Sequence, residues 1–134
     1  MVAIAEPATK GDARAVLQLA EQGVPVNNRD IRGTTPLWHA ASQRHTDTVR
    51  VLLATNAVDV NAASVANRTP LFWPAAHGYV EVVKLLLNHG AQSDCIDVNG
   101  ESPLTIAQFH GQTEVVSVLS GYNAWPTFEE AQKL

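Results

Sequence analysis

Short apolar stripes recur along this chain at a spacing typical of helices. Val82, Leu85 and Leu86 follow an i, i+3, i+4 pattern, which places them on one face of a helix. Comparable stripes occur in four segments: Ala15–Ala20, Val49–Leu53, Val82–Leu87 and Val115–Leu119. These segments start 33 or 34 residues apart. The pattern therefore predicts four similar helices in a repeating chain.

A second feature keeps the same period and precedes the last three stripes. It is a hydroxyl residue followed by Pro-Leu, in TTPLWHAA (Thr34–Ala41), RTPLFWPAA (Arg68–Ala76) and ESPLTIAQ (Glu101–Gln108). The hydroxyl residue can cap a helix N-terminus, and the proline suits the first helical position, where no N–H is needed. Glycines suited to left-handed helix ends occur at Gly11 and Gly23 in the first unit and at Gly78, Gly90 and Gly111 in the later units. Each unit is predicted to be a pair of helices.

One pair of this kind cannot bury its apolar face alone, so neighbouring pairs must stack. We predict one all-α domain over residues 1–122, with units at about 1–28, 29–62, 63–95 and 96–122. The first unit lacks Thr-Pro-Leu and is polar enough to act as an N-terminal cap. Residues 123–134 are predicted to be a capping tail in which Trp125 and Phe128 cover the last pair. A partner-binding motif is the alternative for these two aromatic residues.

The recurring motifs resemble the ankyrin repeat family, whose unit of about 33 residues has a turn, a Thr-Pro-Leu helix start and a second helix with Val-x-x-Leu-Leu. The resemblance covers about residues 2–122 and implies an ankyrin-repeat solenoid with β-turn or hairpin tips. The sequence departs from the family at Trp38, Phe72 and Thr105, where His is usual after Thr-Pro-Leu. It also has Arg44 where Gly is usual between the helices.

The resemblance implies a protein-binding scaffold or adaptor that meets its partner through a concave face. The alternative is a regulatory or structural segment of a larger enzyme or receptor. Nothing in the sequence indicates catalysis, because the five histidines form no HExxH motif and the glycines form no phosphate-binding loop. We therefore expect no enzyme activity, no cofactor and no bound metal.

Composition narrows the partner and the compartment. Hydrophobic residues make up 46% of the 134 and charged residues 16%, which indicates a folded domain. The formal net charge of −4 disfavours nucleic acid as a partner, and no apolar stretch approaches the roughly 20 residues that cross a bilayer. Cys95 is the only cysteine, so no intrachain disulfide can form. We expect a cytoplasmic or nuclear protein, monomeric in isolation, whose partner is another protein.

The predicted binding residues lie at three turn tips and on the outward side of the first helices. The tips are Asp30–Gly33, Ser64–Asn67 and Asp97–Gly100, because Asp-x-x-Gly favours a turn and Asn67 tolerates positive φ. Their variable residues are Ile31, Arg32, Thr34, Val65, Ala66, Arg68, Val98, Asn99 and Glu101. On the helices, Leu37, Ala40, Leu71, Pro74, Leu104 and Ala107 should face inward. The outward set is then His39, Ser42, Gln43, Trp73, Ala76, His77, Ile106, Phe109 and His110.

Within this set, Trp73, Ile106 and Phe109 are predicted to form an exposed apolar strip that anchors a partner. Arg32 and Arg68 are the predicted charged selectors. The alternative is that Trp73 and Phe109 are partly buried between helices. Pro74 bears on this choice, because a proline at the fifth helical position removes a hydrogen bond and forces a late start or a kink.

Charge is distributed unevenly along the chain. Residues 1–68 hold seven Lys/Arg and six Asp/Glu, a net of +1, whereas residues 69–134 hold two and seven, a net of −5. A partner with an acidic end over the first repeats and a basic end over the last would be steered into register. The alternative is ordinary solvated surface charge.

Overall fold

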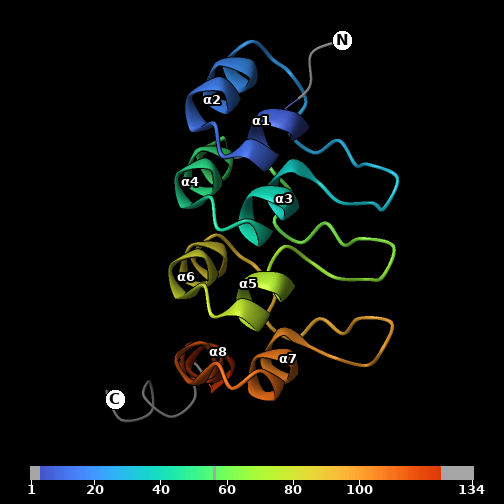
Figure 1. Ribbon diagram of the computed structural model, residues 1–134, viewed down its shortest axis with the longest axis vertical. Helices are drawn as coiled ribbons and strands as arrows, with labels where there is room; N and C mark the ends of the chain where they lie inside the picture. The colour runs from blue at the N-terminus through green and yellow to red at the C-terminus, as the bar shows by residue number, and fades with distance from the viewer. Residues whose placement is uncertain (1–3, 56, 125–134) are drawn as a thin grey trace, which may run out of the picture.

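The computed structural model describes residues 4–55 and 57–124, and over these ranges it contains eight helices and no strands (Figure 1). The helices are α1 (Ala5–Lys10), α2 (Ala13–Glu21), α3 (Pro36–Ser42), α4 (Thr46–Ala54), α5 (Phe72–His77), α6 (Val80–Asn88), α7 (Pro103–Phe109) and α8 (Thr113–Ala124). They form four consecutive pairs, as predicted, and the all-α fold class is confirmed. Helix α8 continues past residue 122, and the role predicted for Trp125 and Phe128 lies outside the described residues.

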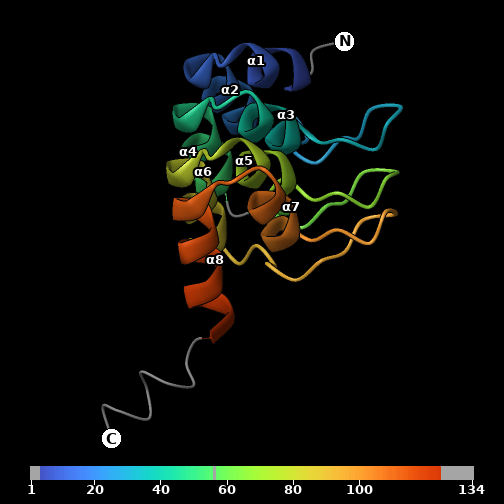
Figure 2. The ribbon, with the colours of Figure 1, turned by 60° about the horizontal axis from the view of Figure 1, so that its bottom comes forward.

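The pairs stack in two layers (Figures 1 and 2). The first helices of the pairs, α1, α3, α5 and α7, lie one beside the next, and the second helices, α2, α4, α6 and α8, form the other layer. The segments that join successive pairs project as long loops beyond the first helices (Figure 2). We call the surface of the first helices and these loops the inner face, and the surface of the second helices the outer face.

Each projecting loop ends in the tight turn predicted for it. The fourth residue donates its N–H to the carbonyl oxygen of the first at 2.8 to 3.0 Å: Gly33 to Asp30, Asn67 to Ser64 and Gly100 to Asp97. Neighbouring tips are also bonded to each other. The N–H of Val65 donates to the oxygen of Arg32 at 2.9 Å, and that of Val98 to the oxygen of Ala66 at 3.0 Å. The three tips therefore form one row held in fixed register.

Helix α5 starts later than its counterparts. Helices α3 and α7 begin at the proline of the Pro-Leu motif, but α5 begins at Phe72 and not at Pro70. A start at Pro70 would place Pro74 where its missing N–H leaves a helix carbonyl without a partner. The late start moves Pro74 into the first turn, where no N–H is needed. One consequence is that the hydroxyl of Thr69 makes no cap hydrogen bond.

The core runs through the stack between the two layers. Its largest fully buried side chains include Leu37, Leu52, Leu71, Phe72, Leu86 and Leu119. The positions predicted to face inward are buried, except that Leu104 is half-buried. Two positions predicted to face outward are buried instead, since Ala76 is 2% exposed and Ile106 is 6% exposed. Helices α5 and α7 each contact more than one neighbouring helix, so each buries a wider sector than one i, i+3 stripe.

Side chains from one repeat cover the turn between the helices of the repeat before it. His45 lies over Gly11, and Gln112 lies over Gly78. In the second case the Nε2 amide of Gln112 donates to the carbonyl oxygen of Ala76 at 3.0 Å. Neighbouring pairs are therefore held together by contacts at these glycines as well as by the apolar core.

Gly78→Ala is expected to destabilise the protein more than Gly23→Ala. Both glycines have positive φ, 77° and 84°, which alanine adopts at a cost of about 1 kcal/mol. An alanine Cβ at position 78 would lie 2.9 Å from Cδ of Gln112, whereas at position 23 no described atom lies within 4 Å. We expect urea denaturation to show a loss of about 2 kcal/mol for Gly78→Ala and about 1 kcal/mol for Gly23→Ala. Equal losses would contradict the covering role of Gln112.

Candidate functional site

The Asp30 carboxylate organises the first tip. Its Oδ1 atom accepts hydrogen bonds from the amides of Arg32 and Thr34 at 3.0 and 2.9 Å. Its Oδ2 atom accepts the Thr34 hydroxyl at 2.6 Å and lies 3.0 Å from Nε2 of His39. Thr34 is therefore only 4% exposed, and the exposure predicted for it is wrong because its hydroxyl turns inward to the carboxylate. His39 is half-buried because its ring also turns toward this carboxylate.

A buried ion pair links the second and third tips. The side chain of Asp97 is fully buried, and its Oδ1 atom accepts the amides of Asn99 and Glu101, both at 2.9 Å. Its Oδ2 atom accepts a hydrogen bond from Nε of Arg68 at 3.1 Å. Arg68 was predicted to be a charged selector for a partner. Its charge is instead paired with Asp97, so its main electrostatic partner lies within the protein.

These hydrogen bonds change the acidity of both carboxyl groups. Burial alone would raise the pKa of Asp30, but hydrogen bonds led by that of the Thr34 hydroxyl outweigh it and hold this pKa well below its usual range. Burial is likewise outweighed at Asp97, where the amide of Glu101 and the side chain of Arg68 lower the pKa. Both groups therefore remain carboxylates in the folded protein under mildly acidic conditions.

Stability is expected to fall in acid because of these two groups. A carboxyl group with a lowered folded-state pKa stabilises the fold above its unfolded pKa of about 4, and this contribution is lost as the pH falls toward the folded-state pKa. We expect the free energy of unfolding, measured with urea, to fall below about pH 4. Asp30→Asn or Asp97→Asn should flatten that dependence. A wild-type profile that stays level down to pH 3 would count against this account.

Three exposed aliphatic side chains occupy the same position in successive tips. Ile31, Val65 and Val98 are 97%, 75% and 68% exposed. They are separated by 34 and 33 residues, and the bonds between neighbouring tips hold them in line. We call these three residues the tip row. It forms an apolar edge that the fold itself leaves uncovered.

A line of stacked cationic and aromatic side chains runs along the third repeat and ends at the turn of the second. The guanidinium carbon of Arg68 lies 5.3 Å from the ring centroid of Trp73, whose ring stacks on His77 with centroids 5.8 Å apart. His77 continues to Tyr79 at 5.4 Å, and Arg44 covers Tyr79 at 5.3 Å. We call these five residues the aromatic ladder. Trp73 is half-buried within it, which corresponds to the partly buried alternative for this residue.

Tyr79 was not predicted from the sequence, and Arg44 was recognised only as a departure from the usual glycine, although the repeat period could have placed both at turns between helices. Tyr79 follows His45 by 34 residues and Arg44 follows Gly11 by 33, so both align with a covered turn between helices. Arg44 has φ of 61°, in the left-handed region that Gly11 also occupies with φ of 78°. An arginine at a position that favours glycine places a guanidinium over the ring that covers the turn.

The predicted strip of Trp73, Ile106 and Phe109 is not continuous. Phe109 is 80% exposed, and its ring meets His110 edge-on with centroids 5.2 Å apart. The exposure predicted for Ile106 is wrong, because α7 packs against both α5 and α8 and places this side chain in the core. Glu101 is half-buried. The remaining predicted contacts are exposed: Ile31, Arg32, Gln43, His77, Asn99 and His110.

A groove lies where two neighbouring tip loops meet α3 and α5. It has a volume of about 210 Å³ and is lined by Arg32, Thr34, Trp38, Ser64, Val65, Ala66, Arg68 and Trp73. One member of the tip row and two members of the aromatic ladder thus border the same groove. This is the point where the features of the inner face converge.

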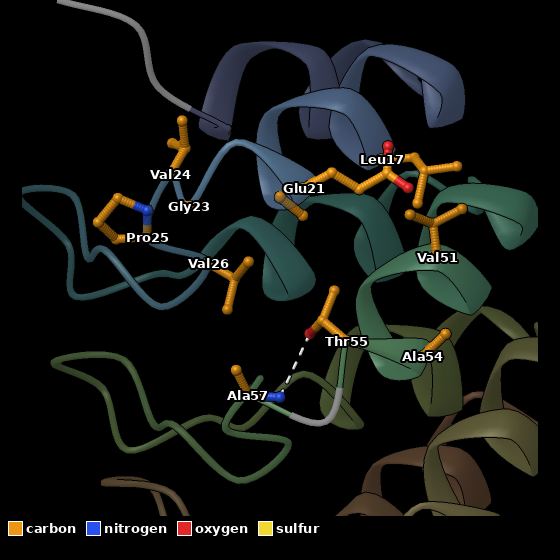
Figure 3. Close-up of a pocket in the computed structure, with 11 residues that line it drawn as sticks. Leu17, Glu21, Gly23, Val24, Pro25, Val26, Val51, Ala54, Thr55 and Ala57 are labelled. Atoms are coloured by element: carbon orange, nitrogen blue, oxygen red, sulfur yellow. Dashed lines mark hydrogen bonds between the residues drawn. The ribbon is translucent and has the colours of Figure 1, made fainter.

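A second hollow, of about 500 Å³, lies beside the outer helices α2 and α4 (Figure 3). Leu17, Val24, Val26, Val51 and Ala54 line much of it. The Thr55 hydroxyl at its edge accepts the amide of Ala57 at 3.4 Å. The lining is mainly apolar and contains one charged residue, Glu21, so the hollow offers less specificity than the groove on the inner face.

The chemistry available at these sites favours binding. Asp30, Thr34 and His39 have the residue types of a hydrolytic centre, but the buried Thr34 hydroxyl donates to the carboxylate and is not activated by the ring. In the part of the chain that the structure describes, no three His, Cys, Asp or Glu side chains gather as metal ligands. No helix there has the length and apolarity to span a bilayer.

Comparison with known families gives the same assignment as the fold. The family described as ankyrin repeats (3 copies) matches over residues 1–97 and again over residues 58–128. The chain belongs to the ankyrin repeat family. Members of this family are generally protein–protein interaction modules and are typically not enzymes. Comparison with curated proteins gives no significant match.

Proposed function

We propose that this protein is a scaffold or adaptor that binds a partner protein through its inner face. The observation that carries the proposal is the apolar and aromatic surface on that face, formed by the exposed tip row, exposed Phe109 and His77, and half-buried Trp73. Aromatic residues and arginine are enriched at the centres of protein interfaces, where rigid rings bury large areas at little entropic cost. The rigid row of tips supplies a surface that is already organised before binding.

Charge supports an orientation for the partner. The net of +1 over residues 1–68 and of −5 over residues 69–134 favours a partner with acidic groups near the first repeats and basic groups near the last. Because Arg68 and Asp97 neutralise each other, the orientation depends on the remaining surface charges. A location in the cytoplasm or nucleus, where the single cysteine would remain reduced, is part of the proposal.

A pull-down from native cell extract tests this function. We expect the double variant Trp73→Ala/Phe109→Ala to recover the partner at least about tenfold less well than wild type, because interface anchors commonly contribute 2 kcal/mol or more. Leu17→Ala, in the hollow beside the outer helices, is the control and should leave recovery unchanged. His77→Ala, at an exposed position of the ladder, extends the test if the double variant unfolds. Full recovery by folded inner-face variants, or loss with Leu17→Ala, would refute the proposal.

A further inference from the structure

We propose that the groove between the first two tips recognises an aspartate or glutamate side chain on an extended segment of the partner protein. This inference rests on the proposed function and names the chemistry that the inner face selects. Arg32 supplies the ionic contact, and the rings of Trp38 and Trp73 with Val65 supply apolar walls.

Arg32 carries the available positive charge of the groove. The other guanidinium, that of Arg68, is paired with the buried carboxylate of Asp97 and lies over the ring of Trp73. Within residues 4–55 and 57–124, the guanidinium of Arg32 makes no ion pair or hydrogen bond. The neighbouring carboxylate of Asp30 is already occupied by amides, a hydroxyl and an imidazole. Arg32 is thus exposed and ready to bind an external anion.

The exposed side chain in the groove that lacks a partner, Arg32, is a hydrogen-bond donor. The indole Nε1 of Trp38 also finds no acceptor among the described residues, but it is buried, so the apolar surface of that ring borders the groove. The Thr34 hydroxyl is committed to Asp30, and the Ser64 hydroxyl accepts the amides of Ala66 and Arg68, both at 3.3 Å. A ligand that presents acceptors and no donors complements this set, and an ionised carboxylate has that character.

The number of free cations favours a carboxylate over a phosphate group. One guanidinium matches one carboxylate in a bidentate pair, whereas a phosphate group of nearly two negative charges calls for a cluster of cations. The apolar surroundings favour a protein segment as the carrier of this group. Exposed Val65 and Ile31 in the tip row would contact apolar residues on either side of the acidic one.

Selection from a displayed library of random 12-residue peptides on the folded protein tests the inference. We expect the recovered peptides to share an Asp or Glu flanked by apolar residues. Arg32→Ala should weaken the binding of a recovered peptide about tenfold or more, the effect typical of losing a hydrogen bond to a charged group. The control is Arg14→Ala, which removes the same charge from exposed α2 and should change affinity less than about twofold.

A double-mutant cycle makes the test specific to this contact. Replacing the peptide's Asp or Glu by Asn or Gln should lower affinity for wild type and have little further effect on Arg32→Ala. Additive losses, binding unaffected by Arg32→Ala, failure to recover peptides, or tighter binding of a phosphoserine version would each overturn the inference. None of these outcomes decides the proposed function, which depends on the response of the native partner to Trp73→Ala/Phe109→Ala.

Discussion

Phe72→Ala is expected to lower the free energy of unfolding by about 3–5 kcal/mol, the largest stability effect that we predict for a single substitution. Phe72 has no exposed surface and sits in α5, which contacts helices of the repeats on both sides. Removing its ring would leave a cavity that the side chains of the surrounding repeats cannot fill. Because the stability of a solenoid depends on contacts between neighbouring repeats, the loss should spread beyond the third repeat.

Phe109→Ala is the matched control, since it removes the same ring from α7, on the inner face, at a position that is 80% exposed. Its effect should stay within about 0.5 kcal/mol. Urea denaturation monitored by circular dichroism measures both variants. Similar losses at the two positions would show that the assignment of Phe72 to the core and Phe109 to the surface is incorrect.

Asp97→Ala is expected to cost about 3 kcal/mol, the second large effect. The substitution removes a fully buried carboxylate that holds the third tip and leaves the Arg68 guanidinium without its partner. It also leaves the amides of Asn99 and Glu101 without their acceptor. Breaking one side of a buried ion pair commonly costs about 3–5 kcal/mol, and the partial exposure of Arg68 places this pair at the lower end.

Asp94→Ala removes the same charge from an exposed position three residues away and should change stability by less than about 0.5 kcal/mol. Denaturation of the two variants at pH 7 compares them directly. If Asp97→Ala were no more harmful than Asp94→Ala, the ion pair would not stabilise the tips, and the explanation of the acid sensitivity would fail with it.

Local signals in the sequence predicted the repeating architecture well. Thr35 and Ser102 cap their helices as expected, each accepting the backbone amide three residues later at 3.2 Å. The tip turns also follow from short motifs, because the carboxylates of Asp30 and Asp97 accept the amides of Arg32 and Asn99 within the same turns. Interactions over a few residues are readable in sequence, since the chain itself fixes their geometry.

Exposure was harder to predict where it depends on distant segments. Ile106 lies on the predicted outward side of α7, yet the packing of α7 against both α5 and α8 buries it. Arg68 meets Asp97, 29 residues later in the chain, only because the second and third tips stack in register. Helical periodicity predicts a face of the helix but does not give the width of the buried sector or the partners brought by stacking.

Trp73 shows how one sequence irregularity leaves several outcomes open. Pro74 predicted either a late helix start or a kink, and each would orient the neighbouring tryptophan differently. The late start of α5 leaves Trp73 between the guanidinium of Arg68 and the ring of His77. Its position therefore depends on Arg68 before the helix and on His77 at the end of the helix, which the proline alone does not specify.

Site-specific photo-crosslinking tests most directly whether the inner face binds the partner. Replacing Phe109 by p-benzoylphenylalanine puts the photoreactive group on the inner face. Replacing exposed Lys84 by the same residue puts the group on helix α6, on the outer face. We predict that irradiation in native extract links the partner recovered in the pull-down to position 109 and not to position 84. Crosslinking of that partner at position 84 without crosslinking at position 109 would contradict the account.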